Sequence, residues 1–172
     1  AAGAVLLEPN DTYGLQDTVH YTNGKHSDLL KMPAGGSLRP ASHETIDQDL
    51  HYLQQDGRPV FRHAVTGMSD VCTEIMERND LSDTDIDFLV PHQANRRIID
   101  ATAKRMGLPP DKVMMNIDRY GNTTAATVPL CLYDWHADLK PGQNLILTTF
   151  GGGLTWGASY LTWANDGAAY VD

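Results

Sequence analysis

The sequence lacks several features that would place it in particular classes of protein. No apolar run approaches the roughly 18 residues that a membrane-spanning helix needs. Positive charge is scarce, because 13 Lys and Arg stand against 22 Asp and Glu and the net charge is −9. A chain of this charge is not drawn to nucleic acid or to anionic membranes. We therefore expect neither as a partner.

Cysteine is nearly absent as well. Cys72 and Cys131 can form neither a disulfide framework nor a zinc pattern, and both lie among apolar neighbours in helix-like stretches. We expect buried, inert thiols in a protein of the reducing cytoplasm. The histidines apart from His92 show no spacing typical of metal ligands, so no metal site is predicted.

The start of the chain lacks the marks of a targeting segment. Residues 1–11 have no basic beginning and no long apolar region, which argues against a signal peptide. They also lack an initiator Met and open directly in strand-like sequence. We expect a fragment or a processed chain, although 172 residues are enough for one domain with its own core.

Apolar patterns along the chain predict an α/β fold. Residues 3–8 and 15–22 are typical of strands, and residues 23–45 are rich in Gly, Pro, Ser and His, as in a loop region. The later elements are expected in alternation: helix 59–78, strand 86–90, helix 93–106, strand 113–117, helix 123–139, and strands 143–150 and 154–163. This order predicts a mostly parallel mixed sheet covered by helices, with its last pair antiparallel.

Three polar features each follow a predicted strand. They are His92, Asn122 and the glycines 151–153. Ligands of open α/β sheets bind outside the carboxyl ends of parallel strands, so these groups are expected to meet in one place. Each also has a purely structural interpretation: a histidine near a helix start, an N-cap residue, and a tight turn.

Together, the three features favour chemistry at a thioester or carbonyl group. A neutral imidazole and a side-chain amide can both donate to one carbonyl oxygen, which would stabilise an enolate. Three successive glycines leave backbone N–H groups open to a ligand oxygen, as in an oxyanion hole.

Several motifs resemble one known family, the β-ketoacyl-acyl carrier protein synthases III, which have the thiolase-like fold. The resemblance runs from residue 1 to about residue 163. It is carried by "VPHQANRRIIDATAKRMG", "DRYGNTTAATVPL" and "FGGGLTWG", and also by "AAGAVLLE" and "GRPVFRHAV".

The resemblance implies decarboxylative Claisen condensation of an acyl-CoA starter with malonyl-acyl carrier protein, which begins fatty acid synthesis without a cofactor. A cysteine would carry the acyl group. His92 and Asn122 would bind the malonyl thioester oxygen, the Gly152 N–H would join an oxyanion hole, and Phe150 would form a wall of the active site.

The resemblance also implies two binding surfaces. The pantetheine tunnel would be lined by Gly57, Phe61, Ala94, Asn95 and Ile98. Arg97 matches a carrier-protein docking arginine of the family, and we add the basic residues Arg62, Lys104 and Arg105 to this surface. The alternative for these charges is an ordinary solvated helix face.

The family has two similar halves, and this chain resembles the second. Residues 1–45 would be the end of the N-terminal half and a connecting loop, and residues 46–172 the C-terminal half. The nucleophilic cysteine would lie in the missing half, on a preceding segment or a second chain, and the complete enzyme would be a homodimer. The alternatives are a non-catalytic subunit or pseudo-enzyme half that binds carrier protein, and a polyketide-type ketosynthase.

Overall fold

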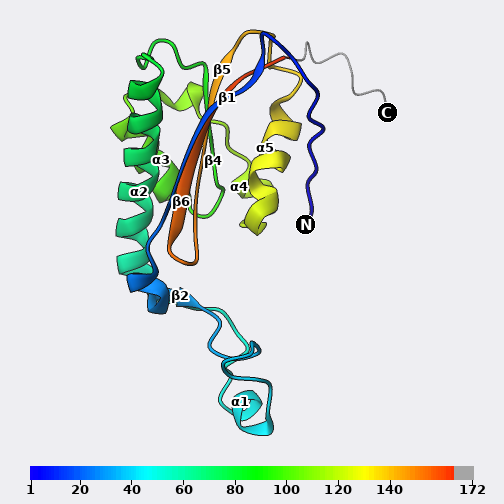
Figure 1. The fold of residues 1–172 in the computed structure, drawn as a ribbon, viewed down its shortest axis with the longest axis vertical. Coiled ribbons are helices and arrows are strands. Elements are labelled where there is room, and N and C mark those ends of the chain that lie inside the picture. The colour runs from blue at the N-terminus through cyan, green and yellow to red at the C-terminus, as the bar shows by residue number, and fades with distance from the viewer. Residues whose placement is uncertain (165–172) are drawn as a thin grey trace.

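A four-stranded mixed sheet forms the centre of the computed structural model, which describes residues 1–164 (Figure 1). The strand order is β1 (Gly14–Thr22), β6 (Thr155–Thr162), β5 (Asn144–Gly151) and β4 (Phe88–Pro91). β4 pairs with β5 in parallel, whereas β5–β6 and β6–β1 are antiparallel. In this described part, no helix combines the length and apolarity that a membrane crossing would require.

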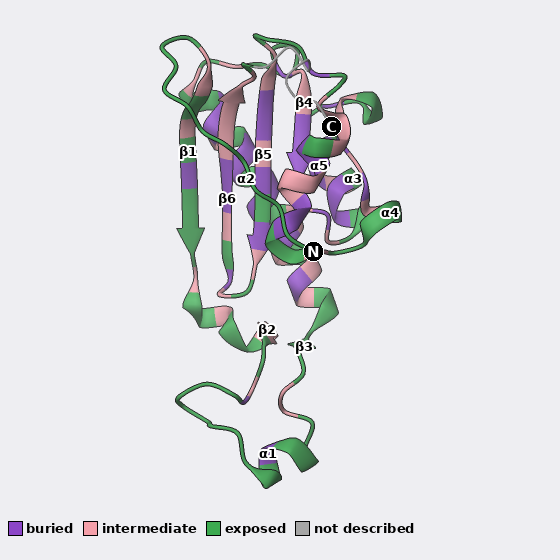
Figure 2. Cartoon of the chain, turned by 90° about the vertical axis from the view of Figure 1, so that its right-hand side faces the viewer, coloured by how far each residue is buried: buried purple, intermediate pink, exposed green. Residues whose placement is uncertain are grey.

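Helices cover both faces of the sheet. α2 (Gly57–Arg78) and α3 (Arg96–Arg105) lie on one face, and α5 (Thr127–Trp135) lies on the other (Figure 1). Successive strand residues point to opposite faces, so Leu89 packs in the cluster of α2 and α3, whereas Val90 packs against α5. Burial on both faces explains why the β4 sequence is an unbroken apolar run. Figure 2 shows β4 and β5 as the most buried strands.

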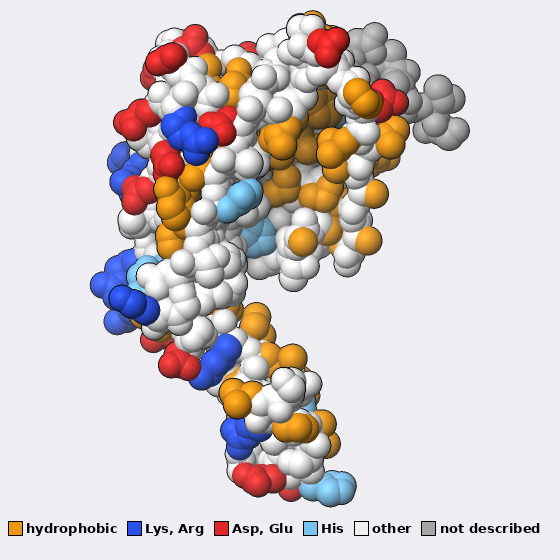
Figure 3. All heavy atoms as spheres, viewed as in Figure 1, with side chains coloured by type: hydrophobic (Ala, Val, Ile, Leu, Met, Phe, Trp, Pro, Cys, Tyr) orange, Lys and Arg blue, Asp and Glu red, His pale blue; other side chains and the backbone are white. Residues whose placement is uncertain are grey.

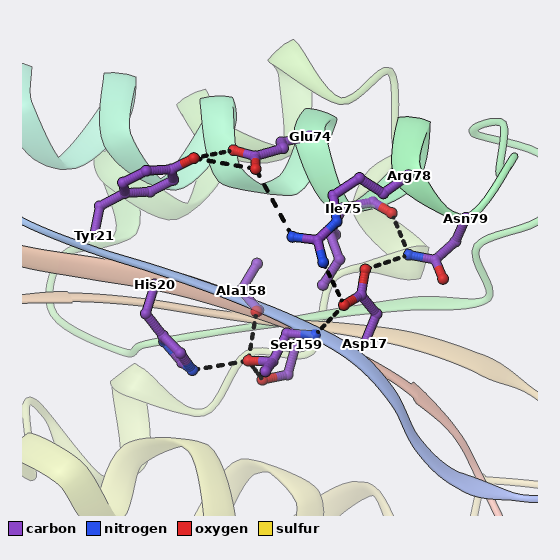
Figure 4. Close-up of polar contacts among 10 residues, drawn as sticks. Asp17, His20, Tyr21, Glu74, Ile75, Arg78, Asn79, Ala158 and Ser159 are labelled. Carbon is purple, nitrogen blue, oxygen red and sulfur yellow. Dashed lines mark hydrogen bonds and ion pairs between the residues drawn. The ribbon is translucent and has the colours of Figure 1, made fainter.

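A polar network attaches the edge strand β1 to α2 (Figure 4). The carboxylate of Asp17 accepts hydrogen bonds from the Arg78 guanidinium at 2.8 Å and from the Asn79 amide at 2.9 Å. The Tyr21 hydroxyl donates to Glu74 at 2.9 Å. The bond from Asn79 is the main reason why the pKa of Asp17 is lowered. These contacts connect β1 to α2, whereas its backbone pairing with β6 holds it in the sheet.

An arm projects from the lower end of the sheet (Figures 1 and 2). It consists of η1 (Gly24–Leu29), the two-stranded ribbon of β2 (Leu30–Lys31) and β3 (Gln54–Gln55), and α1 (His43–Asp47). The arm thus has more regular structure than the loop region expected at residues 23–45.

Residues 3–8 were expected to form a strand, and this prediction is wrong for the described structure. The first thirteen residues form no strand, and Leu6 and Leu7 are 85% and 80% exposed. A strand needs a partner to satisfy its backbone hydrogen bonds, and no other described strand lies beside this segment.

The expected domain boundary at residue 45 stays a prediction, and the end of the second domain, residues 165–172, lies outside the described residues.

The expected strand at residues 113–117 is also wrong. This segment makes one parallel bridge, Leu89 to Val113, and then turns into α4 (Ile117–Tyr120). The sheet is therefore mixed, as predicted, but only one of its three strand pairs is parallel. The segment lies between η2 (Pro110–Lys112) and α4, and no second bridge follows Val113 in the described chain.

The other elements agree with the prediction apart from their ends. The helix expected at 123–139 is split into η3 (Thr124–Ala126) and α5, because the chain begins this region in a tight 3₁₀ turn. Pro129 lies in the first turn of α5, where its missing N–H costs no helical hydrogen bond.

Candidate active site

A large open cavity lies at the carboxyl ends of β4 and β5. Its volume is about 2130 Å³, and its walls come from β1, β5, β6, the arm and the starts of α2, α3 and α5. His92, Asn122 and Gly152 all line it, as does Phe150. The structure therefore brings together the three polar features that the sequence places after separate strands.

His92 continues the line of β4 into the cavity. Its backbone N–H donates to the Thr148 carbonyl at 2.8 Å, which extends the β4–β5 pairing by one residue. The ring Nδ1 is 2.6 Å from Oγ1 of Thr127, and Nε2 has no hydrogen-bond partner among residues 1–164. Burial lowers the pKa of His92, because a charged imidazolium is poorly solvated there. Burial therefore favours the neutral ring.

Gln93 is a fully buried amide behind the histidine. Its Nε2 donates to the carbonyls of Pro91 at 2.8 Å and Met114 at 3.2 Å, and its Oε1 accepts from the Asn116 N–H at 3.1 Å. One side chain thus connects the end of β4 to the segment that leads to Asn122. Sequence patterns did not identify this role, because a buried and an exposed glutamine look alike beside a helix start.

Asn122 uses one end of its amide for local structure. Oδ1 accepts a hydrogen bond from the Thr124 N–H at 2.9 Å, and a backbone N–H can only donate, so this contact fixes the orientation of the amide. The side chain thus stabilises the turn before η3, but it is not the N-cap that the structural interpretation predicts, because Thr123 is the N-cap of η3 and Ala126 that of α5. Nδ2 is left with no partner in the described chain and can donate to a ligand.

Asp134 holds the loop that carries Asn122. Its carboxylate, in a side chain only 8% exposed, pairs with Arg119 at 3.1 Å. It also accepts hydrogen bonds from Asn116 Nδ2 at 2.9 Å and from the Tyr120 hydroxyl at 3.2 Å. Gly121 then ends α4 at φ 65°, a conformation that favours glycine. The loop is therefore fixed on both sides before it reaches the cavity.

The glycine turn joins β5 to β6. Leu154 exchanges two backbone hydrogen bonds with Asn23, at 2.8 and 3.0 Å, which fixes the turn against the end of β1. The Gly152 N–H makes no hydrogen bond to residues 1–164, so it is available to a ligand oxygen. An added Cβ at Gly152 would meet the Leu30 carbonyl at 3.4 Å, so the arm also borders this wall.

The residues predicted for a pantetheine tunnel line the same cavity. They are Gly57, Phe61, Ala94, Asn95 and Ile98. Asn95 is also the N-cap of α3, because its Oδ1 accepts from the Arg97 N–H at 2.9 Å. Their binding role stays a prediction.

The four predicted docking residues lie in different surroundings, and their docking role stays a prediction. Arg62 and Arg97 line the cavity, and the Arg97 guanidinium lies 5.2 Å from the centre of the Phe61 ring. Arg105 instead pairs with Asp70 of α2 at 2.9 Å, and Lys104 lines a second, smaller hollow. The structure thus places only two of the four at the cavity.

The two thiols are buried, as expected, and neither lines the cavity. Desolvation raises the pKa of both Cys72 and Cys131 to about 12. Neither thiol can supply a thiolate near neutral pH. Within residues 1–164, no cluster of His, Cys, Asp or Glu is arranged to hold a metal ion.

The fold and site together define a thiolase-like α/β protein with a cavity at its strand ends that carries a few polar groups. A family model described as 3-oxoacyl-acyl-carrier-protein (ACP) synthase III C terminal matches residues 76–163. The chain belongs to this family.

Individual relatives agree with this assignment. A β-ketoacyl-acyl-carrier-protein synthase III from Porphyromonas gingivalis is 56% identical over 97% of the chain and 50% of its own length. The crystal structure of 3-oxoacyl-(acyl carrier protein) synthase III from Pseudomonas aeruginosa is 38% identical, with a TM-score of 0.77 over 88% of this chain and 44% of that one. The priming β-ketosynthase of the R1128 polyketide pathway is 29% identical, with a TM-score of 0.78 over 92% and 47%. The chain thus spans about half the length of the relatives it matches.

We predict that replacing Gln93 by Leu lowers the free energy of unfolding by about 1–3 kcal/mol, because the buried Asn116 N–H loses its acceptor. Urea unfolding monitored by circular dichroism measures this change. Gln48→Leu at the exposed C-cap of α1 is the matched control and should be near neutral. Equal stability of the Gln93→Leu variant and the parent would contradict the bridging role.

We predict that His92 titrates below the roughly 6.5 of an unperturbed histidine. Because the folded-state pKa is lowered, the stability linked to neutral His92 is fully present above about pH 6.5. It is lost as the pH falls through the lower folded-state pKa. NMR of the ring C–H signals gives the pKa of His92 in the folded protein. Urea unfolding between about pH 4 and 8, roughly two pH units on either side of the ordinary histidine pKa, gives the change of the free energy of unfolding with pH. His92→Gln should remove this component, whereas His43→Gln on the exposed α1 should keep it.

Proposed function

We propose that this chain is the C-terminal half of a condensing enzyme that begins fatty acid synthesis. The complete enzyme joins an acyl-CoA starter to malonyl-acyl carrier protein by decarboxylative Claisen condensation, with no cofactor. The observation that carries this proposal is that His92, Asn122 and the Gly152 N–H line one cavity and keep donor or acceptor atoms unused.

The reaction needs a cysteine that this chain does not place at the cavity. A thiolate of that cysteine takes the acyl group from a thioester. Malonyl thioester then loses carbon dioxide, and the resulting enolate carbon attacks the acyl-enzyme and releases the thiolate. The product is a β-ketoacyl thioester.

His92 and Asn122 serve the decarboxylation step in this proposal. Negative charge develops on the malonyl thioester oxygen as carbon dioxide leaves, and hydrogen bonds to that oxygen lower the barrier. The free Nδ2 of Asn122 is suited to donate such a bond. The Gly152 N–H stabilises the oxyanion in the acyl-transfer steps, and the buried Phe150 shields the departing carboxylate from water.

The nucleophilic cysteine comes from the other half of the enzyme, on a preceding segment or a second chain. Apolar side chains gather on the face where α5 and the N-terminal segment lie (Figure 3). Val5, Leu15 and Tyr133 are each at least 60% exposed. Such a surface is typical of an interface, and the chain spans half the length of its relatives. We infer that the other half covers it, in a homodimer of the cytoplasm.

A polyketide-type ketosynthase is the second candidate, because the R1128 priming β-ketosynthase matches 92% of this chain. Both candidates use the same site residues, so they differ in the acyl groups that the complete enzyme accepts. A pseudo-enzyme half remains the alternative outside catalysis, and a residue other than cysteine at the nucleophile position would favour it.

We predict that His92→Ala and Asn122→Ala each slow decarboxylation of malonyl-carrier protein about 10²–10³-fold in the complete enzyme, as loss of an oxyanion donor does elsewhere. Release of radiolabelled carbon dioxide measures the rate. His43→Ala and Asn10→Ala, both exposed, are the matched controls. Rates like the parent's in both site variants would refute the assigned roles.

We predict that Arg97→Glu raises KM for malonyl-carrier protein at least about tenfold and leaves acyl-CoA use nearly unchanged. The reason is that an exposed positive charge at the cavity attracts an acidic carrier protein, and the substitution reverses this charge. Steady-state kinetics with each substrate tests this. Arg96→Glu is the control, since Arg96 lines the second hollow. An equal loss with both substrates would show that Arg97 supports the site itself.

A further inference from the structure

Three hydrogen-bond donors meet at the carboxylate of Asp134 on α5. Its Oδ2 accepts from Asn116 Nδ2 at 2.9 Å and lies 3.1 Å from the Arg119 guanidinium, and its Oδ1 accepts from the Tyr120 hydroxyl at 3.2 Å. All three donors come from the segment 116–120, which leads directly to Asn122. A carboxylate has two acceptor oxygens and no hydrogen of its own, so this one side chain satisfies the whole group of donors.

The polar contacts continue from Asp134 to the residue behind His92. Asn116 is 3% exposed, and while its side-chain amide donates to Asp134, its backbone N–H donates to Oε1 of Gln93 at 3.1 Å. Gln93 directly follows His92 in the chain and donates to the last carbonyl of β4 at 2.8 Å. A continuous series of hydrogen bonds thus connects the strand end that carries His92 with the loop that carries Asn122.

The first residue of α5 contacts the histidine itself. Thr127 is 2% exposed, and its Oγ1 is 2.6 Å from Nδ1 of His92. Asp134 lies about two turns further along the same helix. One helix therefore touches the His92 ring at its start and the loop before Asn122 near its end.

The network closes at the surface, where Arg119 covers Tyr120. The guanidinium donates to the Tyr120 hydroxyl at 3.0 Å, and its central carbon lies 4.9 Å from the centre of the tyrosine ring. The Arg119 side chain is 58% exposed, whereas that of Asp134 is 8% exposed. An amide in place of the Asp134 carboxylate would offer these donors one oxygen and a competing NH₂ group. The loop would then lose part of its support.

We propose that Asp134 is a positioning residue that holds the Asn122 amide in a fixed place relative to His92. Asp134 itself lies outside the lining of the cavity. In the proposed function, on which this inference rests, Asn122 and His92 donate to one thioester oxygen. Two donors stabilise one oxygen only if both reach it at hydrogen-bond distance, so a small displacement of the loop slows decarboxylation. Acyl transfer to the cysteine does not use Asn122 and is unaffected.

The test is steady-state kinetics of the complete enzyme with Asp134→Asn, a substitution of nearly equal size. We expect kcat for decarboxylation of malonyl-carrier protein to fall about ten- to a hundredfold, with KM and acyl transfer from acyl-CoA nearly unchanged. Asp138→Asn makes the same change at an exposed position just after α5 and should behave like the parent. A parent-like kcat for Asp134→Asn would overturn the inference.

A double variant separates positioning from general damage to the fold. If Asp134 acts through Asn122, then Asp134→Asn slows the parent but does not slow Asn122→Ala any further. Equal slowing in both backgrounds would contradict the positioning role. If Asp134→Asn does not fold, Arg119→Met, which changes the exposed end of the network, replaces it in both backgrounds and is judged in the same way.

NMR of the Asn122 side-chain NH₂ group distinguishes this inference from the proposed function, because it involves no turnover. In the ¹⁵N-labelled complete enzyme, Asn122→Ala assigns the two hydrogens of this group. Asp134→Asn should shift or broaden their signals, and Asp138→Asn should leave them in place. Unchanged signals in Asp134→Asn would count against positioning. If Asn122→Ala decarboxylates like the parent, the proposed role of Asn122 fails, and these spectra still decide whether Asp134 positions its amide.

Discussion

The parallel pairing of β4 with β5 is the constraint on which the site depends. It places the ends of two strands from distant parts of the chain side by side, and the hydrogen bond from His92 to Thr148 extends it into the cavity. The glycine turn that follows β5 is thereby brought to the same edge as His92. Without this register, the imidazole and the Gly152 N–H would have no common ligand.

The polar residues of the site divide their bonding capacity between structure and ligand. Asn122 uses its carbonyl for the turn and leaves its NH₂ group for the cavity, and His92 uses Nδ1 for Thr127 and leaves Nε2. The buried Gln93 uses its NH₂ group and its carbonyl for the backbone and leaves nothing for a ligand. This division separates residues that would contact a substrate from those that hold the contact residues in place, because a group already bonded on every side cannot bind anything more.

The chain combines a buried centre with exposed apolar side chains. β4 and β5 are well buried between α2 and α5, yet apolar side chains of the N-terminal segment and of α5 remain exposed (Figures 2 and 3). The first thirteen residues have no strand partner within the described chain. The chain belongs to the 3-oxoacyl-ACP synthase III family and spans about half the length of the relatives it matches.

The sequence by itself determined the elements whose pattern is local and the residues that lie in recognisable motifs. α2, β4, β5 and β6 follow from apolar periodicity, and His92, Asn122 and Gly152 were identified at strand ends. Only the tertiary structure decided the rest, because it depends on contacts between distant residues. The segment 113–117 has strand-like residues but forms one bridge, to Leu89. Gln93 contacts Met114, and Thr127 contacts His92, and both partners are distant in the sequence. Local sequence carries no information about a hydrogen bond to a distant residue, because only folding brings that residue near.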